Sequence, residues 1–354
     1  MALSGIAGQQ RAIDFLRRVL KKETVPHAFL FSGMQGSGKL ASALELARAL
    51  NCLSPHDHDS CGVCGACRKL REGLHPDVVH IKSDGTSIKL DQIRELVKRF
   101  RFRPFEGKYR IVIIHDAQRM LEVAQNALLK ILEEPPQANL FILLAPESQM
   151  LLSTIVSRCC QVRFQPLDES HVADILVRED GLSPESAASV ARLAEGSIEK
   201  ARWFCGQNPE EGWKRVIDRM ESLGEICILD FFPMISQWAK GCENAERDFE
   251  FIKLWVRDLI LFRVTEAQKT GGACRGAGCG LTFDLSERSL KAAGQVPLEH
   301  LFILYQKVEL AMQGFKINAN LQMSLEGLCL AIKDFLYGKG DWNSFSKRGK
   351  ALSF

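Results

Sequence analysis

The sequence lacks the features of a secreted or membrane-spanning protein. No uninterrupted apolar stretch approaches the roughly 18 residues that cross a bilayer. The first residues, 1–6, show no basic segment followed by a long apolar one, so we expect no secretory signal. These absences predict a cytoplasmic protein with no membrane partner.

The sequence also has little excess charge of either sign. Its formal net charge is only +3 over 354 residues, so any contact with nucleic acid must come from a local patch. With 46% apolar and 25% charged residues, the composition is that of an ordinary globular protein. The length predicts two or three domains.

A disulfide framework is not expected, although the chain has 12 cysteines. In a reducing compartment, cysteines spread over a chain of this length are rarely crosslinked. Four of them are spaced like metal ligands. We expect the remaining eight to act as small apolar residues. These eight are Cys159, Cys160, Cys205, Cys227, Cys242, Cys274, Cys279 and Cys329.

A glycine-rich stretch at 33–40 lies between an apolar run at 28–31 and an Ala/Leu-rich helical pattern at 41–50. Strand, loop and helix in this order are the setting of a phosphate-binding loop, where backbone N–H groups and the helix N-terminus face phosphate oxygens. Lys39 is placed to reach the β- and γ-phosphates. The consensus then has Ser or Thr as a Mg²⁺ ligand, whereas Leu40 offers no oxygen. The alternative is an ordinary glycine turn that caps a helix.

Asp116 ends the clearest buried strand of the sequence, at 110–116. In phosphate-loop ATPases a carboxylate at this position holds Mg²⁺ through water, and a second carboxylate orients the attacking water. Here the next residue is Ala117, whose methyl group can do neither. The alternative for Asp116 is a helix N-cap. The candidate nucleotide-binding residues are Gly33, Gly36, Ser37, Gly38, Lys39, Leu40 and Asp116, and ATP with Mg²⁺ is expected to bind weakly at most.

Four cysteines, Cys52, Cys61, Cys64 and Cys67, have the spacing C-x8-C-x2-C-x2-C. Four thiolates form a closed tetrahedral shell, a common structural zinc site. A set of free thiols and an Fe–S cluster are the alternatives. Three nearby histidines, which could replace one cysteine, are His56, His58 and His75.

Two basic features remain open. Arg158, in Ser157-Arg158-Cys159, is either a solvated charge at a sheet edge or a finger that reaches a neighbouring subunit's nucleotide. A basic run at 98–110 carries interleaved phenylalanines; it could touch phosphates, or it forms one solvated face of an edge strand or helix end.

Strand and helix patterns alternate through the first 165 residues, which predicts a mostly parallel sheet covered on both faces. Strands are expected at 28–31, 78–81, 110–116, 140–144 and 161–164; helices at 6–20, 41–50, 68–72, 91–99 and 123–134. Asp91 is the expected N-cap of the helix that ends at Arg99. Helical patterns continue at 171–178, 184–194, 198–205, 213–223, 226–240, 244–265, 298–313 and 320–338. A glycine-rich loop is expected at 270–280 and a fraying tail at 339–354.

Taken together, these motifs resemble those of the bacterial clamp-loader ATPases of the AAA+ class, and among them the delta-prime subunits of DNA polymerase III. The resemblance rests on the phosphate loop, the four-cysteine module inserted after its helix, and Ser157-Arg158-Cys159. It also rests on Asn126-Ala127-Leu128-Leu129-Lys130-Ile131-Leu132-Glu133-Glu134-Pro135-Pro136 and on Asn318-Ala319-Asn320-Leu321-Gln322-Met323-Ser324-Leu325-Glu326.

The departures from the family's motor subunits all remove catalytic groups. Leu40 replaces a hydroxyl residue and Ala117 replaces the second carboxylate. The polar sensor residue is absent from Leu144-Ala145-Pro146-Glu147, and Gly196-Ser197-Ile198-Glu199 has no lid arginine. The resemblance therefore implies a largely non-hydrolysing subunit that keeps Arg158 for its neighbour's ATP site.

By this resemblance the chain has three domains. They are an AAA+ α/β domain at 1–166 with a zinc module at 52–67, a helical lid at 167–208, and an all-helical collar at 209–354 that holds a ring of subunits together. The implied partners are the gamma/tau and delta subunits, and through them a sliding clamp and primed DNA. The implied assembly is part of a DNA-directed DNA polymerase holoenzyme, a nucleotidyltransferase complex.

Two other functions compete with this interpretation. The chain could itself be an ATP-hydrolysing motor of the gamma/tau type, which Lys39 and Asp116 favour and Leu40, Ala117 and Glu199 oppose. It could instead be a zinc-knuckle nucleic-acid-binding module on a degenerate ATPase fold, which the near-neutral charge opposes.

Overall fold

The computed structural model describes residues 3–22, 24–99, 103–205, 209–242, 244–268, 281–282, 285–316 and 320–338. The chain divides into two compact units, Met1–Gly206 and Gln207–Phe354, and each is described by itself. Several features predicted from sequence lie outside the described residues. These are the loop at 270–280 with Cys274 and Cys279, the tail at 339–354, and Phe100, Arg101 and Phe102.

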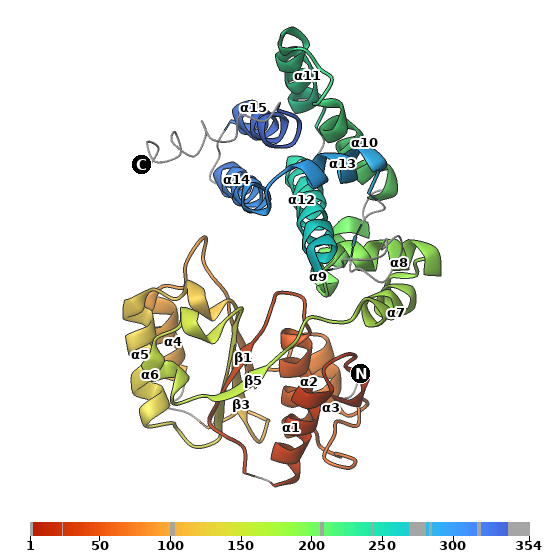
Figure 1. Ribbon diagram of the computed structural model, residues 1–354. Coiled ribbons are helices and arrows are strands. Elements are labelled where there is room, and N and C mark those ends of the chain that lie inside the picture. Colours follow the sequence, from red (N-terminus) through yellow and green to blue (C-terminus); the bar gives the residue numbers. More distant parts are fainter. Residues whose placement is uncertain are drawn as a thin grey trace. The chain divides into compact units, whose positions relative to one another are not determined.

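The amino-terminal unit is built on a five-stranded sheet in which every pairing is parallel (Figure 1). The strands are β1 (Ala28–Ser32), β2 (Val78–Ile81), β3 (Arg110–Ile114), β4 (Asn139–Ala145) and β5 (Cys160–Arg163). Their order across the sheet is β2-β3-β4-β1-β5. The three middle strands are buried along their whole length, which explains their continuous apolar runs.

Helices cover both faces of this sheet, as the alternation of patterns predicted. They are α1 (Gln10–Lys21), α2 (Lys39–Asn51), α3 (Gly65–Arg71), α4 (Leu90–Arg99), α5 (Glu122–Glu133) and α6 (Ser153–Val156). In Figure 1, α1 to α3 lie on one side of the sheet and α4 to α6 on the other. Alternate strand residues feed two separate cores: Phe29 packs with the α1–α2 side and Leu30 with the α4–α5 side.

One helix start differs from its prediction. Helix α4 begins at Leu90, so Asp91 lies inside the first turn and is not the N-cap. The Lys89 backbone N–H donates instead to Gln92 Oε1 at 2.9 Å, so this backbone donor at the start of the helix has a hydrogen-bond partner. Asp91 still favours the helix electrostatically, because a carboxylate in the first turn faces the positive end of the helix dipole.

Three further helices complete the first unit: α7 (Glu169–Asp180), α8 (Pro184–Leu193) and α9 (Ile198–Cys205). Helix α8 starts with a Ser183 cap, whose side chain accepts from the Ser186 N–H, and with proline in its first turn. Each of the three helices contributes buried residues to this small helical layer, among them Leu176, Val190 and Phe204. The domain boundary at 166 and 167 stays a prediction.

The second unit is helical in every described element. It contains α10 (Pro209–Ser222), α11 (Ile228–Gly241), α12 (Ala245–Gln268), α13 (Glu287–Gln295), α14 (Leu298–Lys316), α15 (Leu321–Ile332) and a π-helical turn at Lys333–Tyr337. The sequence patterns did not predict α13, although Ser286 is an N-cap residue whose side chain accepts the Ser289 N–H. Helix α12 is the central one, with Trp255 and Phe251 fully buried. None of the helices described is long and apolar enough to cross a membrane.

Candidate functional site

The glycine-rich stretch forms a tight loop between β1 and α2, at the carboxyl end of the sheet. Lys39 is the first residue of α2, and its Nζ donates to the carbonyl oxygens of Gly33 and Met34 at 2.5 and 2.7 Å. Gly33 donates its own N–H to the carbonyls that end β4, at 3.2 Å to Ala145 and 2.9 Å to Pro146. The loop is therefore anchored to the end of β4, and its lysine folds back onto the loop's own carbonyl oxygens.

The start of α9 rests directly on the apex of this loop. The Ile198 N–H donates to the Gly36 carbonyl at 3.1 Å, and Gln35 Nε2 donates to Glu199 Oε1 at 3.1 Å. Gly36 has a φ of +76°, and a Cβ there would lie 2.3 Å from Ser197 Oγ. Only glycine therefore fits both the backbone angle and the contact. We call the two hydrogen bonds, Ile198 to Gly36 and Gln35 to Glu199, the lid latch.

Lys39 is the main charged group of the glycine-rich loop. Burial lowers the pKa of its ammonium group, while the carboxylates of Asp116 and Glu199 act in the opposite direction. The structure thus brings Lys39, Asp116 and Glu199 together at one edge of the sheet, although they come from three distant parts of the sequence. A carboxylate at 199 adds negative charge where a phosphate site needs positive charge.

Asp116 follows β3 and has a left-handed backbone, with φ +46°. It occupies the N-cap position of a short 3₁₀ turn, Ala117–Arg119, but its side chain makes no capping hydrogen bond there. The carboxylate is 44% exposed and lies 4.0 Å from Arg119 Nε. Ala117 is fully buried, and Leu40 is 38% exposed with no polar atom to offer. Neither residue can complete a Mg²⁺ or water site.

Arg158 lies at the amino ends of the strands, whereas this loop lies at their carboxyl ends. It immediately precedes Cys159 and the amino end of β5, whereas the loop follows the carboxyl end of the adjacent parallel strand β1. Its guanidinium pairs with Glu133 Oε1 at 2.9 Å and donates to the Thr154 carbonyl at 3.0 Å. Arg158 is half-exposed and is not brought together with Lys39.

The four cysteines of the module converge, as their spacing predicted. Their Sγ atoms all lie within 4.8 Å of one another, and the pairs Cys52–Cys64 and Cys52–Cys67 are 3.9 and 3.7 Å apart. Two thiolates held 2.3 Å from a tetrahedral ion lie about 3.8 Å apart, so the spacing suits a zinc-sized ion. Backbone N–H groups donate to three of the sulfurs, which favours the thiolate form.

None of the three histidines belongs to this cluster among the described residues. His56 lies in an isolated bridge with Asp59. His75 is buried; its Nδ1 accepts the Asp77 N–H at 3.2 Å, and its Nε2 lies 3.7 Å from Glu106 Oε1. The donor set is therefore all sulfur, which suits a structural metal site with no open position.

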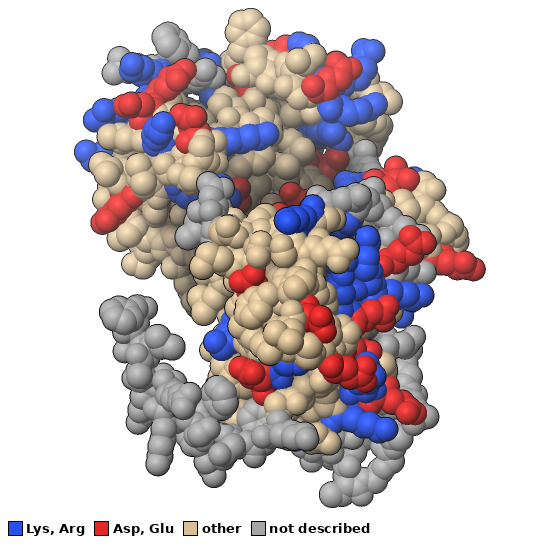
Figure 2. Space-filling view, turned by 90° about the horizontal axis from the view of Figure 1, so that it is seen from above, with Lys and Arg blue, Asp and Glu red and all other residues tan. Residues whose placement is uncertain are grey.

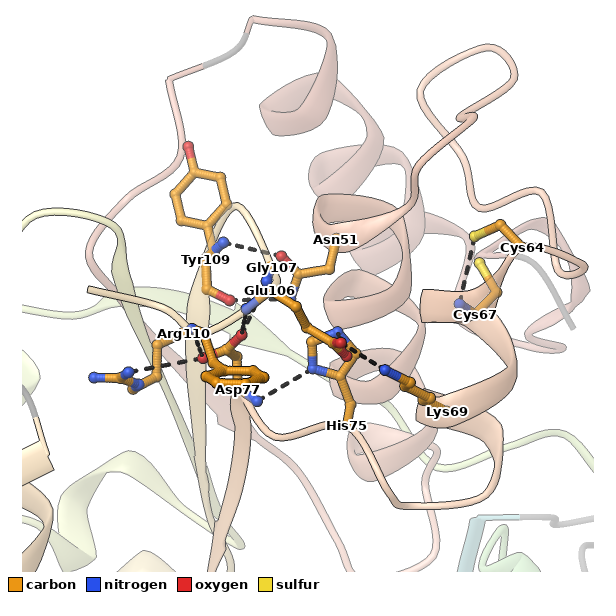
Figure 3. Close-up of polar contacts among 11 residues, drawn as sticks. Asn51, Cys64, Cys67, Lys69, His75, Asp77, Glu106, Gly107, Tyr109 and Arg110 are labelled. Carbon is orange, nitrogen blue, oxygen red and sulfur yellow. Dashed lines mark hydrogen bonds and ion pairs between the residues drawn. The ribbon is translucent and has the colours of Figure 1, made fainter. Parts of the chain in front are cut away.

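A polar network ties the cysteine module to the segment that enters β3 (Figure 3). Lys69, on the module helix α3, pairs with Glu106 at 2.5 Å. Buried Asp77 accepts the backbone N–H groups of Phe105, Glu106 and Gly107 at 2.7, 2.8 and 2.9 Å. Burial alone raises the pKa of Asp77, but these hydrogen bonds and the charge of Arg110 bring it below its ordinary value.

Sequence reasoning missed this network and misjudged one of its members. Arg110 belongs to the basic run at 98–110, yet it is 8% exposed and donates to the Arg103 carbonyl at 2.8 Å. It also lies 3.7 Å from Asp77. Arg110 is therefore a buried structural cation, and only other members of the run are available at the surface.

The parallel sheet, with helices on both faces and a glycine-rich loop after β1, defines the first unit as a three-layered α/β fold. A family profile described as "DNA polymerase III, delta subunit" matches residues 8–168. The chain is similar to the DNA polymerase III subunit delta' of Bacillus subtilis (strain 168), with 32% identity over 264 residues, 74% of this chain and 80% of that protein. It therefore belongs to the delta-prime family of DNA polymerase III subunits.

The chain also shares sequence with a larger relative. It is 32% identical over 222 residues to the DNA polymerase III subunit tau/gamma of Haemophilus influenzae, covering 61% of this chain but only 32% of that protein. Among solved structures, a DNA polymerase III gamma subunit-related protein of Thermotoga maritima aligns over 91% of this chain and 98% of that one. Its sequence identity is 19% and its TM-score 0.46.

Proposed function

We propose that the chain is a cytoplasmic subunit of the replicative clamp loader, which places a sliding clamp on primed DNA. Its similarity to a delta' subunit over 80% of that relative is the observation that carries the proposal. Its partners would be gamma/tau and delta subunits in a hetero-oligomeric ring. The AAA+ domain would end near residue 166, the lid near 208, and the remaining helices would form the collar.

Within that assembly we propose that the chain does not hydrolyse ATP appreciably. Leu40 and Ala117 supply no oxygen at the two positions where Mg²⁺ and water need one. Glu199 adds a carboxylate beside Lys39, and the lid latch occupies the apex of the loop. These residues do not fit a hydrolytic site, although the loop and Lys39 can still hold phosphates weakly.

The catalytic role proposed for Arg158 is that of a finger in trans. The topology supports this role, because Arg158 lies at the sheet edge away from Lys39 and so is poorly placed for its own loop. Its pairing with Glu133 would hold the guanidinium ready in one orientation. A guanidinium can bind two γ-phosphate oxygens at once, which a lysine cannot do.

The cofactor proposed for Cys52, Cys61, Cys64 and Cys67 is one structural zinc ion. The sulfur spacing of 3.7 and 3.9 Å and the all-sulfur donor set support it. Bound zinc would fix the turn of the module and the start of α3. Through Lys69 it would also stabilise the loop that leads into β3.

Turnover by the isolated full chain tests the non-hydrolysing role against the motor alternative. We expect no ATP hydrolysis above that of the Lys39→Ala variant. Steady turnover that Lys39→Ala abolishes would make the chain a motor subunit. The assembly itself is tested by mixing the chain with gamma/tau and delta subunits, where failure to elute as one complex would contradict the clamp-loader assignment.

A further inference from the structure

The loop at 103–109 holds its backbone in one conformation. We call these residues the Phe105 loop. Besides the three N–H groups bound by Asp77, Asn51 exchanges two hydrogen bonds with the backbone of Tyr109, at 3.0 and 2.9 Å. Gly107 packs so closely that an added Cβ would lie 2.8 Å from Asn51 Oδ1. Both ends and the middle of the loop are therefore fixed by buried side chains.

This rigid loop presents an exposed aromatic ring. The Phe105 side chain is 83% exposed, the highest value among the exposed large apolar residues in the described part of the chain. Burying such a ring would stabilise the fold by about 2 kcal/mol, so it contributes little to folding where it stands. Single exposed apolar residues are common on protein surfaces. Phe105 also stands on a backbone that the buried Asp77 carboxylate fixes, so its ring is held out to solvent at a defined place.

The Phe105 loop also carries two basic side chains. Arg103 and Lys108 are both exposed, and neither forms an ion pair with another described residue. The loop's acidic residue, Glu106, is neutralised by Lys69. Elsewhere, over most of the face drawn in Figure 2, basic and acidic side chains lie interspersed. The Phe105 loop therefore combines one aromatic ring with unpaired positive charge, although the whole chain carries only +3.

We propose that the Phe105 loop is a contact site for single-stranded nucleic acid. Phe105 stacks on an unpaired base, while Arg103 and Lys108 contact the flanking phosphates. Stacking platforms flanked by basic side chains are the common way to bind single strands without sequence preference. A rigid loop favours such binding because little conformational entropy is lost when the strand docks. The site is separate from the phosphate-type loop and does not depend on nucleotide or on Arg158.

The test measures fluorescence anisotropy of a fluorescein-labelled oligo-dT of about 20 nucleotides with the full chain at low salt. Replacing Phe105 by Ala should weaken binding about 5- to 150-fold, because one stacked base contributes roughly 1–3 kcal/mol. Phe105→Trp should keep the affinity, since it keeps a ring. Arg103→Ala should lower the slope of log K against log salt by about 0.7.

Leu229→Ala is the matched control, because Leu229 is 81% exposed but lies in the other unit of the chain. It should leave the affinity unchanged. Three results would overturn the proposal: no binding by the unmodified chain up to about 100 µM, equal affinities for Phe105→Ala and Leu229→Ala, or equal binding of a duplex without dependence on Phe105. Loss of subunit assembly by Phe105→Ala with unchanged DNA affinity would also overturn it and would identify a protein contact instead.

Discussion

The lid latch gives a quantitative prediction for nucleotide binding. Glu199 is exposed and acts on Lys39 through its charge, and its Oε1 accepts from Gln35 at 3.1 Å. Glu199→Gln removes the charge and keeps a hydrogen-bonding oxygen. Exposed charge pairs are typically worth up to about 1 kcal/mol, so this variant should bind ATP more tightly by up to about fivefold. Glu199→Ala also removes the side-chain hydrogen bond of the latch, worth about 1 kcal/mol, and should bind more tightly again.

The assay is competition of ATP against a fluorescent nucleotide on the full chain, at low and high salt. Glu185→Gln is the matched control, because Glu185 is an exposed glutamate at the start of α8 and is not among the carboxylates that act on Lys39. The gain in affinity for Glu199→Gln should shrink at high salt, where exposed charges are screened. Neither variant should hydrolyse ATP, since Leu40 and Ala117 remain. The reasoning fails if Glu199→Gln and Glu185→Gln behave alike, or if Lys39→Ala binds as well as either.

Two further predictions concern the amino-terminal unit. Elemental analysis should find one zinc per chain. The Cys64→Ser variant should lose the metal and show faster hydrogen exchange in α3, while β3 and β4 stay protected because the module lies beyond the core strands. Full zinc in the variant, or well under one equivalent in the unmodified chain, would contradict this. His115 follows β3, and its Nε2 lies 3.0 Å from Nδ1 of His80 on β2. Burial, and then the charge of His80, lower the pKa of His115 to about 4. The unfolded chain takes up this proton near pH 6.5 and the folded chain only near pH 4. The free energy of unfolding should therefore decrease as the pH falls through that range, and it should decrease less in the His115→Gln variant.

Local patterns were enough to predict most elements of the sheet. The strand expected at 78–81 matches β2, and the apolar run at 110–116 contains β3, because a buried parallel strand needs a continuous apolar stretch. The cysteine cluster was predictable for a similar reason, since its four ligands lie within 16 residues of one another. By contrast, α13 was missed because it is only 9 residues long and has Gly294, a weak helix former, in its last turn.

Contacts between distant residues could not be predicted. Gln35 and Glu199 are 164 positions apart, and nothing in either local sequence indicates that they meet. Asp77 collects the N–H groups of residues 28 to 30 positions away, so its role depends on how β2 and β3 pair. The same pairing buries Arg110, which the sequence alone placed on a solvated face.

The central claim is that Arg158 serves a neighbouring subunit, and one measurement tests it most directly. The complex is reconstituted with gamma/tau and delta subunits, and its ATPase is measured with clamp and primed DNA present. Arg158→Ala should assemble normally, while turnover at the adjacent ATP site falls about 10³-fold or more and Arg158→Lys restores little. Arg163→Ala, an exposed arginine on β5, should leave turnover unchanged. A complex that contains Arg158→Ala and keeps full turnover at that site would show Arg158 to be a surface charge and would contradict the account.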